Sequence, residues 1–233
     1  MSGSGVRLNK WIADSGFCSR READRLIEEG RVALDGRVGV LGDPVAPGSV
    51  VLVDGRPVAP AQQKIYIAMN KPVGIVCTAD AREPMNVVEY IGYPERIFPI
   101  GRLDKTSQGL LLLTNDGEIV NQMLRAAGRH EKEYVVVVDR PLTGEFLKRM
   151  ASGVEILGTK TLPCEVHQEG RFRFRLVLVQ GLNRQIRRMC EALHYRVESL
   201  TRVRIMNISL NDLEPGHWRH LTEEEISELR AQL

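Results

Sequence analysis

The amino-acid sequence predicts an α+β fold. Strand-like runs rich in leucine and β-branched residues alternate with segments of helical periodicity, and several helical segments start at recognisable N-terminal caps. The two kinds of segment do not follow the regular β-α-β rhythm that would indicate a parallel α/β sheet. The 233 residues are enough for one or two domains, and 43% hydrophobic with 27% charged residues is typical of globular chains.

Residues 6–60 are dense in helix and turn signals. The spacing of apolar residues over 6–12 predicts an amphipathic helix that ends near Gly16. A second helix is expected to start at Ser19, with Glu22 completing a capping box, and to end at Gly30 in the left-handed conformation. Short strands are expected around the turn dipeptides Asp35-Gly36, Pro47-Gly48 and Asp54-Gly55.

The stretch Pro57–Gln63, rich in proline, alanine and glutamine, is interpreted as a linker. We therefore expect two domains, at residues 1–62 and 63–233. In the second domain, strands are expected over 64–69, 74–77, 110–114, 133–138, 172–179 and 202–209. Helices are expected over 116–124, 143–150, 185–193 and 222–233, the last with a capping box from Thr222 to Glu225.

Several function classes lack support in the sequence. No apolar run reaches the ~18 to 20 residues that span a bilayer, and the first residues lack the apolar core of a signal peptide. We therefore expect a cytoplasmic protein without a membrane partner. The four cysteines and five histidines show neither Cys-x-x-Cys nor His-Glu-x-x-His spacing, so neither a disulfide scaffold nor a metal site is expected. Sequence motifs for nucleotide hydrolysis and dinucleotide binding are absent.

Positive charge is concentrated in one segment, although the net charge is only +2. Nine arginines and two acidic residues lie between Arg171 and Arg204. Arginine pairs bidentately with phosphate, so this local basic patch suggests a polyanionic partner, with nucleic acid as the leading candidate. The alternative is an exposed basic strand face for the early arginines of the segment and a solvated helix for Arg188.

Asp104 lies on a glycine-punctuated loop that leads into an apolar strand. The loop places this acid between two cations, Arg102 and Lys105. From the local sequence, Asp104 is either a structural, salt-bridged acid or an ionised carboxylate suited to act as a nucleophile or base. Spacing alone does not choose between these interpretations.

Five basic side chains lie on or near the two helices predicted in the first segment: Arg7, Lys10, Arg20, Arg21 and Arg25. Acidic residues are equally frequent there, so spacing is compatible with either an RNA-binding face or a solvated helical face. The segment resembles the small RNA-binding domain named after ribosomal protein S-four, through R-L-N-K-W-I-A-D-S-G-F-C-S-R-R-E-A-D-R-L-I-E-E-G-R-V and the later V-D-G. In that family the basic faces of the two helices grip RNA, which implies RNA contacts for these five residues.

The Asp104 loop, G-R-L-D-K-T-S-Q-G-L-L, resembles the catalytic motif of RNA pseudouridine synthases. Companion motifs follow the family's order: N-K-P-V-G at 70–74, K-E-Y at 132–134 and G-L-N-R-Q-I-R-R-M-C at 181–190. Together with the first domain, the resemblance covers nearly the whole chain. Within the family, the chain is most similar to the subfamily that acts on ribosomal RNA, and there to the F-type synthases of large-subunit RNA.

The resemblance implies a fold, a reaction and partners. The fold is a mixed, mainly antiparallel sheet with flanking helices, preceded by the S-four-type domain. The reaction is the isomerisation of a specific uridine to pseudouridine in ribosomal RNA, with the large subunit as the expected source and tRNA as a further candidate substrate. Neither a cofactor nor a metal is expected, and the protein is expected to be a monomer.

The resemblance also assigns roles to individual residues. Asp104 is the essential carboxylate, and Tyr134 is the aromatic residue that stacks on the target base, its alternative being a core tyrosine. Arg187 is expected to pair with Asp104, with Arg184 as the rival partner. Arg102 is expected to stabilise the extruded nucleotide or its phosphates, its alternative being a structural pair with Asp104. RNA contacts are also expected from Arg184 and Arg188.

A second hypothesis, from another function class, is a noncatalytic RNA-binding or ribosome-associated protein on the same folds. The joint presence of Asp104, Tyr134 and Arg187 favours the enzyme. A protein that only binds RNA has no need of all three.

Overall fold

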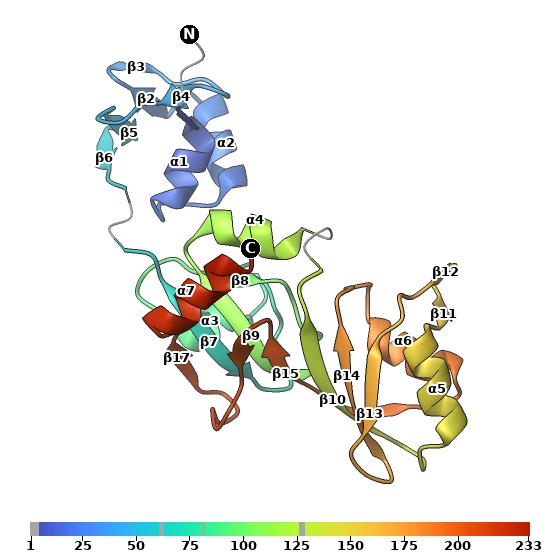
Figure 1. The fold of residues 1–233 in the computed structure, drawn as a ribbon. Coiled ribbons are helices and arrows are strands. Elements are labelled where there is room, and N and C mark those ends of the chain that lie inside the picture. Colours follow the sequence, from blue (N-terminus) through green and yellow to red (C-terminus); the bar gives the residue numbers. More distant parts are fainter. Residues whose placement is uncertain (1–4, 61–62, 81, 126–128) are drawn as a thin grey trace. The chain divides into compact units, whose positions relative to one another are not determined.

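The computed structural model describes residues 5–60, 63–80, 82–125 and 129–233. These residues form two compact units (Figure 1). The smaller unit contains the described residues up to Ile65, together with Tyr93–Ile97 and Asn115–Gly117, and the larger unit contains the rest. The domain boundary expected at residues 62 and 63 stays a prediction.

Two helices and small strands build the smaller unit. Helix α1 spans Leu8–Asp14 and helix α2 spans Arg20–Glu28. The Ser19 hydroxyl accepts a hydrogen bond from the backbone N–H of Glu22, as expected for the N-cap. Only this half of the capping box is recorded among the described residues, because the Glu22 carboxylate pairs with Arg25 instead. Gly30 adopts a φ of +70° at the end of α2, as expected.

The strands of the smaller unit are short and tightly turned. Their sheet has the order β3 (Arg37–Val38), β2 (Val32–Leu34), β5 (Val51–Val53) and β6 (Arg56–Val58). A separate pair joins β1, Val6–Arg7, to β4, Pro44–Val45. The expected linker begins too early, because Pro57 and Val58 belong to β6 at the sheet edge.

A nine-stranded sheet forms the larger unit, with the main order β13-β14-β10-β15-β9-β7-β17. All its strand pairs are antiparallel except β15 with β9, so the sheet is mixed and mainly antiparallel, as expected. Strands β8 and β16 pair with β9 and β15 respectively. The strands are β7 Tyr66–Lys71, β8 Phe98–Ile100, β9 Gln108–Thr114, β10 Lys132–Val138, β13 Glu165–Gln168, β14 Arg173–Leu178, β15 Val197–Ile205, β16 Ile208–Ser209 and β17 Trp218–His220.

The flanking helices pack onto this sheet and enclose two apolar cores. Phe146 and Met150 of one helix and Ile186 and Met189 of another pack against β10, β14 and β15. The second core packs two further helices onto β7, β9 and β16. The helices are α3 Val87–Ile91, α4 Gly117–Leu124, α5 Gly144–Ser152, α6 Gln185–Ala192 and α7 Glu223–Ala231 (Figure 1). The capping box at Thr222 and Glu225 is confirmed.

Two expected strands differ from the structure. Residues 74–77 form only an isolated bridge between Val76 and Asn86, because a turn at Gly74, with a φ of +96°, follows Pro72. The strand expected over 202–209 is split at Met206, whose φ of +51° turns the chain from β15 into β16. Several short elements were not predicted from the sequence: α3, β8, β13, β17 and the hairpin of β11 (Glu155–Ile156) with β12 (Thr159–Lys160).

The two halves of the large sheet join where β9 meets β15. This parallel contact is short, pairing Gln108 with Thr201 and Gly109 with Arg202. A Cβ on Gly109 would lie 2.2 Å from the Arg202 carbonyl oxygen, and its φ is +105°. Only glycine therefore allows the strand that follows the Asp104 loop to approach β15 this closely.

Gly109→Ala is expected to lower the free energy of unfolding by about 1–3 kcal/mol. The side chain disfavours the backbone conformation of residue 109 and prevents its close approach to the backbone of Arg202. Gly144→Ala is the matched control, since a Cβ at the first position of α5 meets nothing within 4 Å. Urea unfolding of both variants measures the difference. Equal stability of the two variants would contradict this account of the junction.

Candidate active site

The loop between β8 and β9 holds Asp104 in place through backbone contacts. The Ser107 N–H donates to the Asp104 carbonyl at 3.0 Å, and the Gly74 N–H donates to the Lys105 carbonyl at 2.8 Å. The Leu103 N–H donates to the Cys77 sulfur at 3.3 Å. These contacts fix the loop on both sides of the acid and leave its carboxylate about one-third exposed.

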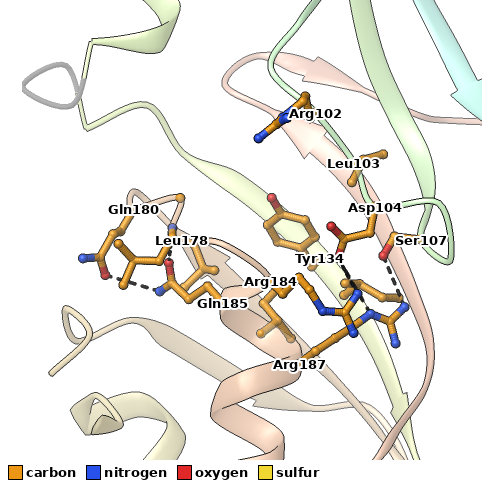
Figure 2. Close-up of a pocket in the computed structure, with 14 residues that line it drawn as sticks. Arg102, Leu103, Asp104, Ser107, Tyr134, Leu178, Gln180, Arg184, Gln185 and Arg187 are labelled. Atoms are coloured by element: carbon orange, nitrogen blue, oxygen red, sulfur yellow. Dashed lines mark hydrogen bonds and ion pairs between the residues drawn. The ribbon is translucent and has the colours of Figure 1, made fainter. Parts of the chain in front are cut away.

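Two arginines of α6 and its N-cap face the Asp104 carboxylate (Figure 2). Arg184 Nη1 lies 3.4 Å from Asp104 Oδ2, and Arg187 Nε lies 4.0 Å from the same oxygen. Arg187 was expected as the partner and Arg184 as the rival, whereas the structure brings both to the acid and places Arg184 nearer. Arg184 reaches it from a left-handed backbone conformation with a φ of +50°.

The guanidinium of Arg187 is buried and holds the Asp104 loop. Its Nη2 donates to the Thr106 carbonyl at 3.0 Å and to the Ser107 hydroxyl at 3.2 Å. Its Nη1 donates to the Val197 carbonyl at 3.3 Å, at the start of β15. Burial, followed by the charge of Arg184, lowers the pKa of Arg187, and the charge of Asp104 acts in the opposite direction. An arginine nevertheless stays protonated in proteins.

Tyr134 completes a small pocket with the acid and the two arginines. The pocket has a volume of about 100 Å³, and we call it the Asp104 pocket. Tyr134 comes from β10, where it pairs with Leu176 and Arg202 next to a bulge. Its ring is half-buried: it lines the pocket and also packs against the apolar core beside α6.

Three further residues that build the pocket were not predicted from the sequence. Ser107 accepts the hydrogen bond from Arg187, and Gln180 and Gln185 close the loop that precedes α6. Gln185 Oε1 accepts from the Leu182 N–H at 3.0 Å, and its Nε2 donates to Gln180 Oε1 at 3.3 Å. Ser107 and Gln185 stand inside the motifs quoted above, and Gln180 directly precedes one of them. The role of Ser107 depends on a contact between segments distant in sequence.

Arg102 and Arg188 do not join the ion pair. Arg102 is exposed, and Figure 2 shows it apart from Asp104. Among the described residues no ion pair of Arg102 with Asp104 is recorded, so its structural alternative is not observed. Arg188 lies on the exposed side of α6 and donates to the backbone and side-chain oxygens of Asn183.

The basic segment between Arg171 and Arg204 is largely neutralised, which corrects the expected patch. Arg173 and Arg175 pair with Glu169, and Glu133 accepts from Arg175 and Arg204, at 2.6 Å in each case. Arg196 pairs with Glu198, and Arg204 also pairs with Glu131. Arg202 is buried. Counting charges within the segment missed this because three of the acids lie outside it or on its flank.

The five basic residues expected to bind RNA in the smaller unit differ in how they are paired. Arg25 forms ion pairs with Glu22 and Glu29, and Lys10 Nζ lies 4.0 Å from Asp14 Oδ2. No ion pair is recorded within the described chain for the exposed guanidinium groups of Arg7, Arg20 and Arg21. These three groups are therefore the better placed to meet a phosphate.

Neither a metal cluster nor a membrane span is found in the part of the chain that the structure describes. Across the described ranges no three His, Cys, Asp or Glu side chains gather as metal ligands. None of the helices in those ranges is long and apolar enough to cross a bilayer.

Arg187→Met is expected to destabilise the fold by ~2–4 kcal/mol, because three acceptors in and near the Asp104 loop lose their buried donor. Arg184→Met should change stability by less than ~0.5 kcal/mol, since its side chain is 42% exposed. Chemical denaturation of both variants provides the comparison. The assignment of Arg187 as the residue that holds the loop fails if the two variants unfold at the same denaturant concentration.

The comparisons with known proteins agree with this geometry. The sequence profile of the RNA pseudouridylate synthase family matches residues 65–192, and that of the S4 domain matches residues 6–51. A solved structure described as a pseudouridylate synthase superposes with a TM-score of 0.70 at 27% identity, covering 96% of this chain and 99% of its own.

Two curated relatives cover nearly all of the chain. The dual-specificity RNA pseudouridine synthase RluF of Escherichia coli K12 is 55% identical over 97% of this chain and 79% of its own length. The ribosomal large subunit pseudouridine synthase B of Bacillus subtilis is 36% identical over 97% of this chain and 96% of its own. All residues that line the Asp104 pocket except Leu200 lie within the stretch that matches the family, and the chain belongs to the RNA pseudouridylate synthase family, with an S4 domain at its N-terminal end.

Proposed function

We propose that this protein isomerises a specific uridine to pseudouridine in large-subunit ribosomal RNA. The observation that carries the proposal is the Asp104 carboxylate, held between the guanidinium groups of Arg184 and Arg187 in a pocket lined by Tyr134. The relative from Bacillus subtilis is named for the large ribosomal subunit, which supports this choice of RNA. The name of the Escherichia coli relative states dual specificity, and we propose tRNA as the second substrate class.

The reaction needs no external reactant. The bond between the ribose C1′ and N1 of uracil breaks, the base turns over, and C1′ bonds to C5. C5 loses its proton and N1 gains one, so the product is an isomer of the substrate. Asp104 assists as an anion, either by adding to the ribose, by adding to the base or by removing a sugar proton. The two arginines lie against the carboxylate and fix its direction.

The target base must leave the helical stack before it can react. Flipping a base costs a few kcal/mol, and stacking on an aromatic ring offsets part of this cost. Tyr134 lines the pocket and is the residue that we assign to this stacking. Arg102 is exposed at the edge of the same pocket, where it can meet the extruded nucleotide or its phosphates. Arg188 and the basic residues of the S4 domain are assigned to the surrounding RNA.

Asp104→Asn is expected to abolish pseudouridine formation, by at least ~10³-fold, while the fold and the RNA affinity change little. Asparagine has nearly the same shape but cannot act as a carboxylate nucleophile or base. Single-turnover assays with excess enzyme and a ribosomal RNA transcript measure the chemical rate. Asp212→Asn, at an exposed turn carboxylate, is the control and should keep the wild-type rate. Substantial turnover by Asp104→Asn would remove Asp104 from the mechanism.

The double substitution Arg7→Gln and Arg21→Gln in the S4 domain is expected to weaken RNA binding without slowing the chemical step at saturation. Each lost phosphate contact should make the negative slope of log K against log salt concentration shallower by about 0.7–0.9. Arg25→Gln is the comparison variant and should change the slope less, because Arg25 is already paired with two glutamates. Filter binding over a salt series tests this, and an unchanged slope in the double variant would contradict the RNA-binding role.

A further inference from the structure

A larger cleft adjoins the Asp104 pocket. It has a volume of about 560 Å³ and shares Arg102, Tyr134 and the segment 180–182 with that pocket. We call it the Lys132 cleft. Its described lining contains no Asp or Glu side chain, whereas it includes five cations: Arg102, Arg125, Arg129, Lys132 and Arg202.

The excess of positive charge is confined to one face of β10 and β15. Side chains alternate between the faces of a strand, so Lys132 and Tyr134 share one face while Glu133 lies on the other. Arg202, which pairs with Tyr134, lines the cleft with them. On the opposite face, Glu133 accepts from Arg175 and Arg204. Arg204 lies on that face although it is two residues from Arg202, because a bulge in β15 shifts the register between the two. The same two strands therefore carry balanced charges on one face and unbalanced cations on the other.

The cations of the cleft face keep unused hydrogen-bond donors. Lys132 Nζ donates to the His130 carbonyl at 2.9 Å, and its other donors have no recorded acceptor in the described residues. Arg202 is only 3% exposed, its Nε donates to the Leu110 carbonyl at 2.7 Å, and its Nη2 is buried without a partner in the described structure.

Electrostatics at Lys132 indicate the same shortage of negative charge. Burial and, after it, the charge of Arg202 lower the pKa of the Lys132 ammonium. Buried like charges without a counter-charge are costly, and an anion in the cleft would relieve that cost.

We propose that the Lys132 cleft binds a backbone phosphate of the RNA strand that carries the target uridine, with Lys132 as the direct contact and Arg202 as a second positive charge beside it. The proposal rests on the proposed function, because it takes the base in the Asp104 pocket to be part of that strand. A strand that places one nucleotide in the pocket must continue into the space that adjoins it, and each linkage carries a negative charge. Met123, Leu162 and Ile205 in the same cleft offer apolar contact to the neighbouring ribose or base.

The first test is the salt dependence of RNA binding by Lys132→Met, which keeps the apolar stem and removes the charge. With a large-subunit ribosomal RNA transcript as the probe, the negative slope of log K against log salt should become shallower by about 0.7–0.9. The affinity at low salt should fall by about 10-fold. Lys132→Arg should keep most of the wild-type slope and of the wild-type affinity. Thermal unfolding verifies the fold of each variant.

Lys148→Met is the matched control, since Lys148 is an exposed lysine of α5 outside the lining of both pockets. It should behave like the wild type. An unchanged slope in Lys132→Met, or an equal loss in Lys148→Met, would overturn the proposal.

The second test locates the phosphate. RNA fragments that span the modified uridine, or the tightest-binding region if none is modified, each carry one uncharged methylphosphonate linkage. In the wild type, one position should weaken binding more than the others. In Lys132→Met, replacement at that position should cost nothing further, because the contact is already lost. The same loss in both proteins at every position would show that Lys132 does not touch the backbone.

A third measurement separates this proposal from the proposed function. At saturating enzyme, the single-turnover rate of Lys132→Met should fall by a smaller factor than its RNA affinity at low salt, since the lost contact is one of binding. A collapsed rate with an unchanged salt slope would place Lys132 in the chemical step and overturn the phosphate site. If the wild type itself forms no pseudouridine, the proposed function fails, while the slope and the methylphosphonate coupling still decide the phosphate site.

Discussion

The site depends on the hydrogen bonds that the buried guanidinium group of Arg187 donates. This group joins three segments that are distant in sequence: α6, the Asp104 loop through Thr106 and Ser107, and the start of β15 at Val197. A lysine could not serve all three acceptors with one compact ammonium group, whereas the planar fork of arginine can. Because Arg187 is engaged with the scaffold, the more exposed Arg184 makes the closer contact with the carboxylate. Arg187 thus positions the loop, and Arg184 makes the closer ion pair with Asp104.

Charge in the larger unit is organised by strand faces rather than by stretches of sequence. Glutamates 131, 133 and 169 neutralise arginines on one face of the sheet, and the Asp104 pocket and the Lys132 cleft lie on the other. This separation matters for a protein that binds a polyanion. Arginines paired with glutamates fix local geometry, while cations without partners remain available to phosphate.

The junction of β9 with β15 connects this electrostatic arrangement to the fold. Gly109 brings β9 close to the backbone of Arg202, and the Asp104 loop immediately precedes that strand. The same contact fixes Arg202, whose Nε donates to Leu110. The loop that carries the acid and the strand that carries the buried cation are therefore held by one short parallel contact, which requires a glycine at its centre.

The sequence by itself determined the elements whose signals are local. The Ser19 and Thr222 caps, the valine-rich strand of Tyr134 and the α+β class follow from hydrogen-bonding propensity and periodicity, and the motif around Asp104 identified the acid. Short elements such as β8 and β17 were not predicted, because their few residues acquire strand geometry only by pairing with β9 and β7. Only the tertiary structure decided which arginine meets Asp104, that most arginines after Arg171 are neutralised, and that Lys132 and Arg202 share a cleft. Each of these depends on distances between segments far apart in the chain, and a linear count of charges contains no such distances.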